Sequence, residues 1–531
     1  MTKRAVAELE ARRLALQEEL DAKRDAAVRN RMGQFATPTA LAFDIQFYAK
    51  AHLGASERIL FMDPAIGTGS FYSALLKVFP QTRIGAAVGY EIDPHYGRPA
   101  AKLWSETGLD IRLENFTRAE APEAAEKFNL VVCNPPYVRH HHIVNGEKQR
   151  LKLRTRDACG VETSGLAGLY CYFLGLSHAW MADGGLAGWL IPSEFMDVNY
   201  GISVKRYLLD KVTLLHIHRF DPSDVQFDDA LVSSAVVWFR NQTPRIGHEV
   251  RFTYGGTLER PKVERLVSVE ALRRDPKWTR YPMKENHEPT EGPVLGDFFK
   301  IKRGLATGNN SYFILSAQEV ERRRLPMEAF KPILPSPRYV PGDEIKGDLK
   351  GNPVLERRLF LLDPPWAENR IRERYPKLWA YLEEGRAKGI ADRYLCRHRM
   401  LWYAQEYRPP APFVCTYLGR SDKKSGRPFR FILNDSRATA ANVYLMLYPQ
   451  GAIRRALQDR PELKRQVWER LNEICPQAML GEGRVYGGGL HKLEPKELGN
   501  VPAEAIAKLL PESERPRRKK QVELFKGTAS R

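Results

Sequence analysis

A short polar and proline-rich segment directly follows an apolar run in the first half of the chain. The run Leu130–Cys133 predicts a buried strand, and Asn134, Pro135, Pro136 and Tyr137 come next. Because proline cannot continue a central strand, the two prolines turn the chain out at the carboxyl end of that strand. A plain turn is one interpretation, since Asn and Pro are ordinary turn residues. A catalytic loop is the other.

The atoms of this loop suit alkylation of an exocyclic adenine amine. The lone pair of that amine is conjugated into the purine ring, which makes the nitrogen a poor nucleophile. The Asn134 side-chain oxygen and the Pro135 carbonyl could accept both amine hydrogens, and so stabilise the positive charge that develops during attack on a methyl sulfonium. Tyr137 offers a ring on which a flipped base can stack. This chemistry requires neither a metal nor a strong general base.

A glycine-rich turn lies upstream, between an apolar run and a helical pattern. Such a turn lets the backbone approach a ligand closely. It is not GxGxxG and no Lys-Ser/Thr follows, so a phosphate cradle is disfavoured. Asp63 could pair with the ammonium of a ligand that carries an amino acid portion, although a simple helix cap explains a lone GxG equally well. The residues expected at the cofactor are Asp63, Pro64, Ala65, Gly67 and Gly69.

An acidic residue ends the next strand candidate. Glu91 follows the glycine-rich turn by roughly 20 residues, the distance at which an acid accepts hydrogen bonds from ribose hydroxyls. The turn and Glu91 together favour a nucleoside ligand over a plain helix cap.

The elements that must position these residues alternate along residues 58–240. Short apolar runs are separated by amphipathic helical patterns, which predicts a mostly parallel sheet with helices on both faces. In such sheets ligands bind beyond the carboxyl ends of the strands, where the residues above fall. The strand candidates are Ile59–Met62, Ala86–Tyr90, Leu130–Cys133, Ala187–Ile191, Val212–His216 and Ser234–Phe239.

The composition limits the classes of protein to which this chain can belong. The chain has 531 residues and a net charge of +19, which indicates two or three domains and favours a polyanionic partner such as nucleic acid. Its six cysteines show no metal-ligand spacing, so we expect reduced, mostly buried thiols. There is no apolar run long enough to span a bilayer and no signal-peptide core, so a cytoplasmic location is expected.

Changes in composition and residue pattern along the chain predict four segments. Residues 1–32 have the composition of one long exposed or docked helix that ends before Gly33. Residues 33–245 form the expected catalytic domain. Residues 246–510, where proline is frequent and basic residues interleave with aromatics, form a second domain. Residues 511–531 are expected to be a basic flexible tail.

In these motifs the chain resembles the gamma-class N6-adenine DNA methyltransferases of type II restriction-modification systems. The resemblance rests on residues 33–38 (GQFATP), on the loop that begins at Asp63, on Asn134–Tyr137 and, less specifically, on segments of the second half. It implies an α/β fold: a seven-stranded, mostly parallel Rossmann-like sheet that binds S-adenosyl-L-methionine, followed by an α+β target-recognition domain.

The resemblance also assigns further residues. Thr37 and Pro38 would lie closest to the methionine part of the cofactor, and Ile92 would pack on its adenine ring. Asn115-Phe116 stands where the family usually has Asp-Phe against that adenine, so the contact made by Asn115 is in doubt. Phe227 would stack on the far face of the flipped adenine. Arg139, with the three histidines that follow it, would line the substrate entrance, and no metal is expected there.

The function implied is site-specific methylation of adenine N6 in double-stranded DNA, which protects the DNA from a cognate restriction endonuclease that shares the site. Basic residues of the second half are expected to contact DNA: Arg393–Arg399, Trp402-Tyr403 and Arg420–Arg430. Methylation of RNA adenine or of a protein glutamine remains an alternative, as does a non-catalytic DNA-specificity subunit. The sequence does not reveal the recognition site or the oligomeric state.

Overall fold

The computed structural model describes residues 1–221, 233–282, 292–420, 427–486 and 490–516. The chain divides into two compact units, built mainly from residues 1–287 and 288–520. Each unit has its own hydrophobic core.

Unit 1 is built on one nine-stranded sheet with the strand order β3-β2-β1-β4-β5-β7-β6-β8-β9. Neighbouring strands from β3 to β5 are all parallel, and β7 is antiparallel to both of its neighbours. The bounds are β1 (Ile59–Asp63), β2 (Ile84–Tyr90), β3 (Leu109–Arg112), β4 (Phe128–Cys133), β5 (Met181–Pro192), β6 (Thr213–Arg219), β7 (Ser234–Arg240), β8 (Glu249–Gly256) and β9 (Pro261–Ser268).

All six predicted strands are present, but the expected number of seven was too low. The four-residue β3 was missed because it alternates apolar and charged residues at the edge of the sheet. The antiparallel pair β8 and β9 was missed because it lies beyond residue 245, where a second domain was expected to begin. Because β8 pairs in parallel with β6, the sheet continues past that boundary and unit 1 extends to His287.

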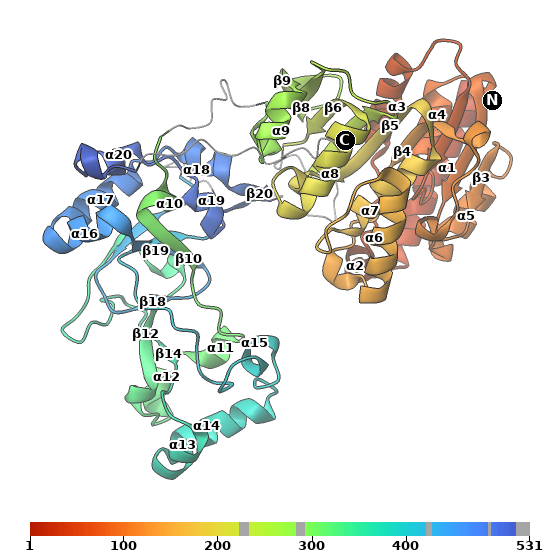
Figure 1. Ribbon diagram of the computed structural model, residues 1–531. Helices are drawn as coiled ribbons and strands as arrows, with labels where there is room; N and C mark the ends of the chain where they lie inside the picture. Colours follow the sequence, from red (N-terminus) through yellow and green to blue (C-terminus); the bar gives the residue numbers. More distant parts are fainter. Residues whose placement is uncertain (222–232, 283–291, 421–426, 487–489, 517–531) are drawn as a thin grey trace. The chain divides into compact units, whose positions relative to one another are not determined.

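Helices cover both faces of this sheet, as the alternating pattern predicts (Figure 1). On β4, Leu130 and Val132 lie in the core beneath α3, α4 and α5, whereas Val131 and Cys133 lie in the core beneath α6 and α7. This alternation follows from the two-residue period of a strand. The helices of unit 1 after the N-terminal pair are α3 (Thr39–His52), α4 (Ser70–Val78), α5 (Pro94–Trp104), α6 (Asn145–Cys159), α7 (Leu169–Leu176), α8 (Ile202–Arg206) and α9 (Val269–Arg274).

The N-terminal segment forms two helices, not the single long helix that was predicted. The first, α1 (Lys3–Ala22), ends three residues before α2 (Ala26–Met32) begins. The Asp25 side chain accepts from the backbone N–H of Ala27 and caps α2, a local interaction that competes with a continuous helix. The expected end before Gly33 is confirmed, since this residue adopts a left-handed conformation with φ of 67°.

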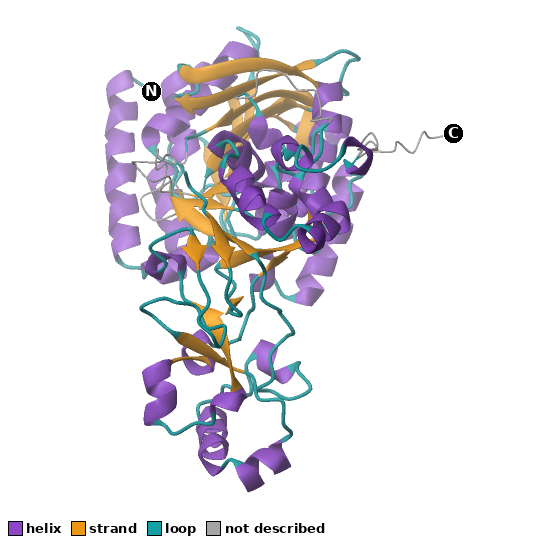
Figure 2. Ribbon diagram, turned by 90° about the vertical axis from the view of Figure 1, so that its left-hand side faces the viewer, coloured by secondary structure: helices purple, strands orange, loops and turns teal. Residues whose placement is uncertain are grey.

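Unit 2 contains three small sheets with strand orders β10-β19-β15-β17-β13, β11-β14-β12-β18 and β16-β21-β20. Figure 2 draws the strands of both units in orange and the helices in purple. Its strands are β10 (Phe299–Arg303), β11 (Ile314–Ser316), β12 (Phe330–Leu334), β13 (Glu344–Ile345), β14 (Leu359–Leu362), β15 (Phe413–Thr416), β16 (Leu418–Arg420), β17 (Phe431–Asn434), β18 (Thr439–Ala440), β19 (Tyr444–Pro449), β20 (Arg484–Tyr486) and β21 (Leu490–Lys492). Its helices are α10 (Leu295–Phe298), α11 (Asn310–Phe313), α12 (Ala317–Arg322), α13 (Glu368–Arg374), α14 (Pro376–Ala387), α15 (Tyr394–Arg397), α16 (Gly451–Asp459), α17 (Leu463–Asn472), α18 (Pro476–Glu482), α19 (Pro495–Gly499) and α20 (Glu504–Ala507).

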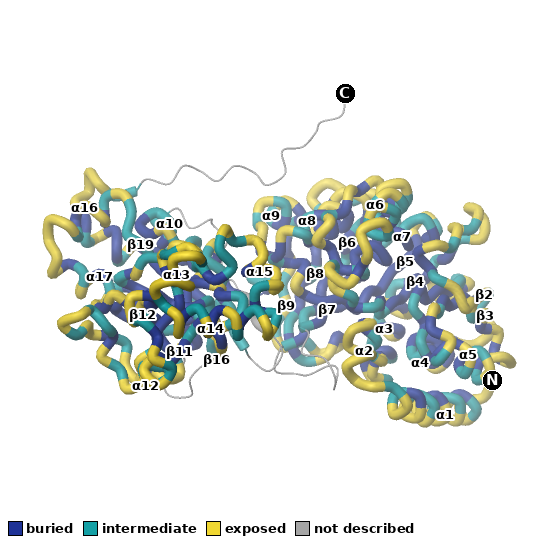
Figure 3. The backbone as a smooth tube through the Cα atoms, turned by 90° about the horizontal axis from the view of Figure 1, so that it is seen from below, coloured by how far each residue is buried: buried dark blue, intermediate teal, exposed yellow. Residues whose placement is uncertain are grey.

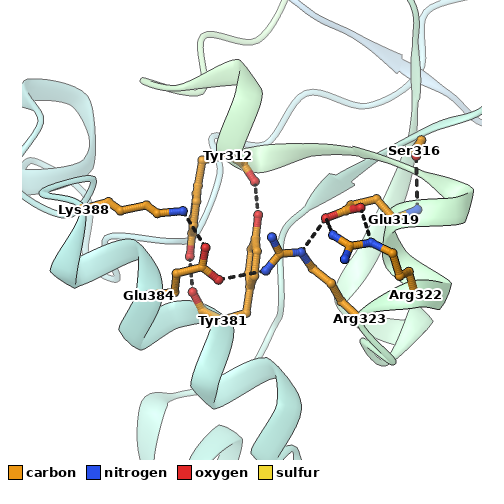
Figure 4. Close-up of polar contacts among 8 residues, drawn as sticks. All are labelled: Tyr312, Ser316, Glu319, Arg322, Arg323, Tyr381, Glu384 and Lys388. Atoms are coloured by element: carbon orange, nitrogen blue, oxygen red, sulfur yellow. Dashed lines mark hydrogen bonds and ion pairs between the residues drawn. The ribbon is translucent and has the colours of Figure 1, made fainter.

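A pair of stacked tyrosines joins α11 to α14 within unit 2 (Figure 4). The rings of Tyr312 and Tyr381 lie 4.8 Å apart, and each hydroxyl donates to the backbone carbonyl of the other residue, at 2.9 and 2.7 Å. Arg323 lies over the Tyr381 ring and pairs with both Glu319 and Glu384. The reciprocal bonds satisfy two buried hydroxyls, which would otherwise carry a desolvation cost of about 1–3 kcal/mol each.

All six cysteines are free thiols, and all but Cys475 are buried, as expected from their spacing. Among the described residues, no helix is both long enough and apolar enough to cross a membrane.

Candidate active site

Three neighbouring parallel strands end at one edge of the unit 1 sheet and bring the predicted site residues together. In the order β2-β1-β4, these strands end at Tyr90, Asp63 and Cys133. Glu91 therefore follows one strand end, the glycine-rich turn follows the next, and Asn134 follows the third. The residues that the sequence analysis singled out separately share one edge because strands of the same direction present their carboxyl ends together.

Asn134 is held by the segment that precedes α3. Its side-chain NH2 donates to the Phe35 carbonyl at 2.9 Å and to the Thr37 hydroxyl at 3.1 Å. Both donors of the amide are thereby engaged, and the amide orientation is fixed. Since an amide carries its acceptor opposite its donors, the Asn134 oxygen is the atom available to accept from a substrate amine.

The same segment also binds the end of the loop Asn134–Tyr137 through its backbone. The Tyr137 N–H donates to the Gly33 carbonyl at 3.1 Å. A side chain on Gly33 would bring a Cβ within 2.3 Å of the Tyr137 nitrogen, so only glycine allows this approach. The resemblance places residues 33–38 over the cofactor. What the structure shows is that they brace the loop Asn134–Tyr137.

Tyr137 is more deeply buried than a free stacking platform would be. Its hydroxyl donates to the Leu190 carbonyl at 3.1 Å, and its ring lies 5.8 Å from that of Phe35. Burial raises the pKa of Tyr137 well above its ordinary value, so the phenol stays protonated. The ring is thus held rigidly in place by contacts at its edge and its hydroxyl.

The two glycines of the glycine-rich turn, Gly67 and Gly69, are glycines for different structural reasons. Gly67 has φ of +55°, and a Cβ there would meet no atom within 4 Å, which leaves space for a ligand. Gly69 has φ of +93°, and a Cβ there would lie 2.5 Å from Nε1 of Trp104. That indole N–H donates to the Thr68 carbonyl at 2.9 Å. The close approach that Gly69 allows is therefore that of the Trp104 side chain, which belongs to the same fold.

Asp63 shapes the start of the turn. Its side chain is 1% exposed and accepts from the Ala65 N–H at 3.0 Å. Burial raises the pKa of Asp63 to about 8, with a further contribution from the nearby Glu91 carboxyl. A cationic ligand would favour the ionised form, because an opposite charge lowers the pKa of a buried acid. Pro64, the next residue, is buried at the bend.

Glu91 connects the second strand end to the turn. Its carboxylate accepts from the Gly67 N–H at 3.1 Å and from the Asp93 N–H at 2.8 Å. Burial raises its pKa, and these backbone bonds oppose the rise. Ile92, next along the chain, is 62% exposed although it is apolar. An exposed isoleucine beside a half-buried acid fits a ligand that presents both a ring face and hydroxyl groups.

The Asn115-Phe116 pair makes contacts that the sequence analysis did not foresee. The Asn115 side-chain oxygen accepts from the Thr117 N–H and hydroxyl, at 3.0 and 2.8 Å, so its NH2 is the group left for a ligand. The Phe116 ring is buried against Tyr90 and Trp180. Phe116 can therefore meet a cofactor only through its backbone.

The proposed substrate residues are only partly described. Arg139 is exposed at the start of the short helical turn His140–His142, beyond the catalytic loop. Its position is compatible with an entrance to the site. Phe227 lies outside the described residues.

Two residues that were not among the expected site residues, Gln34 and Trp104, complete the site. Gln34 donates to Asp93 at 2.8 Å and thereby ties the brace segment to the strand end that carries Glu91. Trp104 closes the other side of the turn. The only sequence signal for these two is that Gln34 belongs to the 33–38 segment. No sequence signal indicates Trp104, because it lies 35 positions after the turn that it braces.

Several basic and aromatic residues that were expected to contact DNA have structural roles in unit 2. Tyr403 is fully buried. Arg430 pairs with Asp343 and donates to three backbone carbonyls. Arg399 donates to the carbonyls of residues 306 and 307. These guanidinium groups stabilise loops that lack regular backbone pairing, and a basic sequence pattern cannot distinguish this use from a phosphate contact. Residues 421–426 of the basic segment lie outside the described residues.

Both halves of the chain are similar in sequence to known proteins. A family model described as Eco57I restriction-modification methylase matches residues 95–226, and one described as the C-terminal domain of type II methyltransferase M.Eco57I matches residues 281–527. The chain is 26% identical over 480 residues to the type II methyltransferase M.XamI of Xanthomonas campestris pv. amaranthicola, covering 88% of this chain and 84% of the relative. It is also 26% identical over 488 residues to the type II methyltransferase M.AccI of Acinetobacter calcoaceticus, covering 88% and 85%.

The fold has a counterpart among solved structures. The Type IIL restriction-modification enzyme MmeI, solved in complex with DNA, superposes with a TM-score of 0.52 at 13% identity over 81% of this chain. The chain spans 64% of the length of that enzyme. At this identity the likeness concerns the fold alone. Sequence similarity along most of both halves assigns the relationship: the chain belongs to the family of type II restriction-modification methyltransferases.

Proposed function

We propose that this chain transfers a methyl group from S-adenosyl-L-methionine to the N6 amine of an adenine flipped out of double-stranded DNA. The observation that carries the proposal is the fixed amide of Asn134. Its two donors are engaged by residues 33–38, so its oxygen is the atom left to accept from a substrate amine. A catalytic group that is held before the substrate arrives need not reorganise during the reaction.

The residues around the turn fit the proposed cofactor. Within the described parts of the chain, no Lys or Arg forms an ion pair with Asp63 or Glu91, and burial raises the pKa of both carboxyls. An ammonium group and two ribose hydroxyls would supply the missing partners. The open space at Gly67 and the exposed Ile92 side chain leave room for the rest of the nucleoside. When bound, S-adenosyl-L-methionine would supply the electrophilic methyl group.

The chain's own residues would prepare the amine for attack. The Asn134 oxygen and the Pro135 carbonyl accept its two hydrogens, which localises the lone pair on N6. As the new N–C bond forms, the S–CH3 bond breaks and its electron pair leaves with sulfur, which gives S-adenosylhomocysteine; both acceptors stabilise the positive charge on the nitrogen. The extra proton then passes to water, since an N-methylated adeninium is acidic and needs no strong base. Pro136 and the buried Tyr137 keep the loop rigid, and the Tyr137 ring supports the flipped base.

The class of substrate is inferred from the charge of the chain and from its relatives. The net charge of +19 favours a nucleic acid, and the named relatives are restriction-modification methyltransferases. We therefore assign DNA as the substrate and protection from a cognate endonuclease as the biological role. The second unit, residues 288–520, is assigned to target recognition.

The test compares methyl transfer to DNA, RNA and protein with the purified full-length chain, followed by long-read mapping of modified adenines in cells that express it. N6-methyladenine in one DNA sequence context is the expected product. Transfer to RNA or to protein glutamine in place of DNA would overturn the assignment.

A matched pair of variants at Thr37 tests the role of the fixed amide. Thr37→Val removes the oxygen that accepts from Asn134, whereas Thr37→Ser keeps it. We expect Thr37→Val to lower kcat by about fivefold, because one neutral hydrogen bond contributes roughly 1 kcal/mol. Thr37→Ser should stay close to wild type. Equal rates for the two variants would show that the Thr37 hydroxyl does not position Asn134.

A further inference from the structure

The first helix, α1, lies against the helices that flank the cofactor turn (Figure 3). Its Val6 and Leu20 side chains are buried, which anchors the helix at both ends. Arg13, midway along it, is 1% exposed although it carries a full charge. A buried guanidinium is expensive unless it is fully hydrogen-bonded, so its partners indicate what the helix is for.

The partners of Arg13 belong to three different elements. Its Nη1 donates to the Ser70 hydroxyl at 3.0 Å and lies 3.3 Å from the Thr68 hydroxyl, both within or next to the cofactor turn. Its Nη2 donates to Thr39, the first residue of α3, at 3.1 Å. Glu10 accepts from Nε and Nη2, each at 2.7 Å, and balances the charge. The guanidinium thus joins the turn to the segment that braces the catalytic loop.

Glu10 completes this arrangement from the same helix. The Thr39 hydroxyl donates to its carboxylate at 2.5 Å. Burial alone would raise the pKa of Glu10, but hydrogen bonds from Arg13, Ser73 and Thr39 outweigh it and lower the pKa. Glu10 is therefore ionised at neutral pH, and its charge stays matched to that of Arg13.

A second set of bonds links the end of α1 to the strand end that carries Glu91. Arg24, just past the helix, pairs with Asp93, and Asp93 in turn donates its backbone N–H to the Glu91 carboxylate. Tyr96 donates its hydroxyl to Asp21 at 2.8 Å. The α1 segment therefore holds both sides of the proposed nucleoside site.

We propose that α1 is an intramolecular clamp on the cofactor site, and that Arg13 is the positioning residue through which it sets the shape of the glycine-rich turn. This inference rests on the proposed function, because it assigns S-adenosyl-L-methionine to that turn. Arg13 does not touch the cofactor space. It acts through Thr68 and Ser70, whose backbone continues from Gly67, the position where a Cβ would meet open space.

Calorimetric binding of S-adenosyl-L-methionine and S-adenosylhomocysteine to the full-length chain tests the clamp. Arg13→Gln removes the charge and most of the bonds, and Arg13→Lys keeps the charge. Arg4→Gln is the matched control, because Arg4 is on the same helix and its side chain is 90% exposed. Ser70→Ala breaks the same contact from the turn and leaves the helix intact. Melting temperatures of the ligand-free variants report folding separately.

The expected result is a Kd about tenfold to hundredfold higher for Arg13→Gln, since roughly one to two charged hydrogen bonds that shape the site are lost. The KM for S-adenosyl-L-methionine should rise in parallel, with kcat at saturation changed much less. Arg13→Lys should be intermediate, Ser70→Ala weaker by about fivefold, and Arg4→Gln unchanged. In the double variant of Arg13 and Ser70, the two losses should be less than additive, because both remove one contact.

A lower melting temperature for Arg13→Gln with a wild-type Kd would overturn the inference, because the residue would then serve stability alone. Wild-type binding by Ser70→Ala together with an unfolded Arg13→Gln would also overturn it. A wild-type chain that binds the cofactor but methylates no DNA would refute the proposed substrate and leave the clamp standing. A wild-type chain that binds no S-adenosyl-L-methionine would refute both.

Discussion

Replacing Gly33 with alanine perturbs the catalytic loop without touching a catalytic group. Gly33 has φ of +67°, and its carbonyl accepts from the Tyr137 N–H at 3.1 Å. A Cβ would lie 2.3 Å from the Tyr137 nitrogen, whereas ordinary contact begins at 3.4 Å. The two backbones must therefore separate by about 1 Å, which moves the loop that carries Asn134 relative to the brace.

The size of the effect follows from that displacement. A 1 Å misplacement of reacting groups costs about 10²-fold in rate, which is roughly 2.7 kcal/mol in the barrier. The left-handed conformation adds about 1 kcal/mol to the cost of folding for any residue with a Cβ. We thus expect kcat for DNA methylation to fall about a hundredfold in Gly33→Ala. Cofactor affinity should change much less, because Gly33 bonds to the catalytic loop and not to the glycine-rich turn.

Gly108→Ala is the matched control. Gly108 has φ of +86°, and a Cβ there would meet no atom within 4 Å. This variant carries the backbone strain without the contact. Single-turnover methyl transfer measures the chemical step, and urea unfolding measures stability. If Gly33→Ala kept a rate within threefold of Gly108→Ala, the contact with Tyr137 would not control the geometry of the loop, and the reasoning would be refuted.

Two further predictions concern the cofactor edge and the sheet. Asn115→Asp keeps the oxygen that accepts from Thr117 and adds a second acceptor for the cofactor's adenine amine. Calorimetry should therefore show about fivefold tighter binding of S-adenosyl-L-methionine. Weaker binding would mean that another group of the ligand lies at that edge. His218 is buried with Nδ1 2.8 Å from the Thr253 hydroxyl, and burial lowers its pKa to about 4. The unfolded chain takes up this proton near pH 6.5, so the free energy of unfolding should fall by about 1.4 kcal/mol per pH unit as the pH drops from 6.5 towards 4, on the order of 3 kcal/mol in all. Urea unfolding of wild type and His218→Gln should differ in this slope, and identical slopes would contradict the assignment to His218.

Much of the fold follows from local patterns. The six apolar runs form strands at the predicted places because each is apolar along most of its length and packs into the core of the sheet. The β8–β9 extension escaped prediction because β9 alternates partly exposed residues, with Leu266 58% exposed, and gives only a weak signal. The break between α1 and α2 depends on a single capping aspartate, which a helical composition obscures.

The sequence by itself determined which residues could do the chemistry. The prolines after β4 and the glycines after β1 have local effects on the backbone, so their meaning can be inferred without a fold. The order of β strands then placed Asp63, Glu91 and Asn134 at one edge, because parallel strands align their carboxyl ends.

Only the tertiary structure decided how these residues are held. The amide of Asn134 is fixed by partners 99 and 97 positions away, and Arg13 bonds to a turn 55 positions away. Arg399 and Arg430 bind backbone carbonyls of their own unit, although their surroundings in the sequence favour phosphate contacts. Hydrogen bonds between distant segments depend on the path of the chain between them, and that path is set by the packing of the whole core and not by any local pattern of residues.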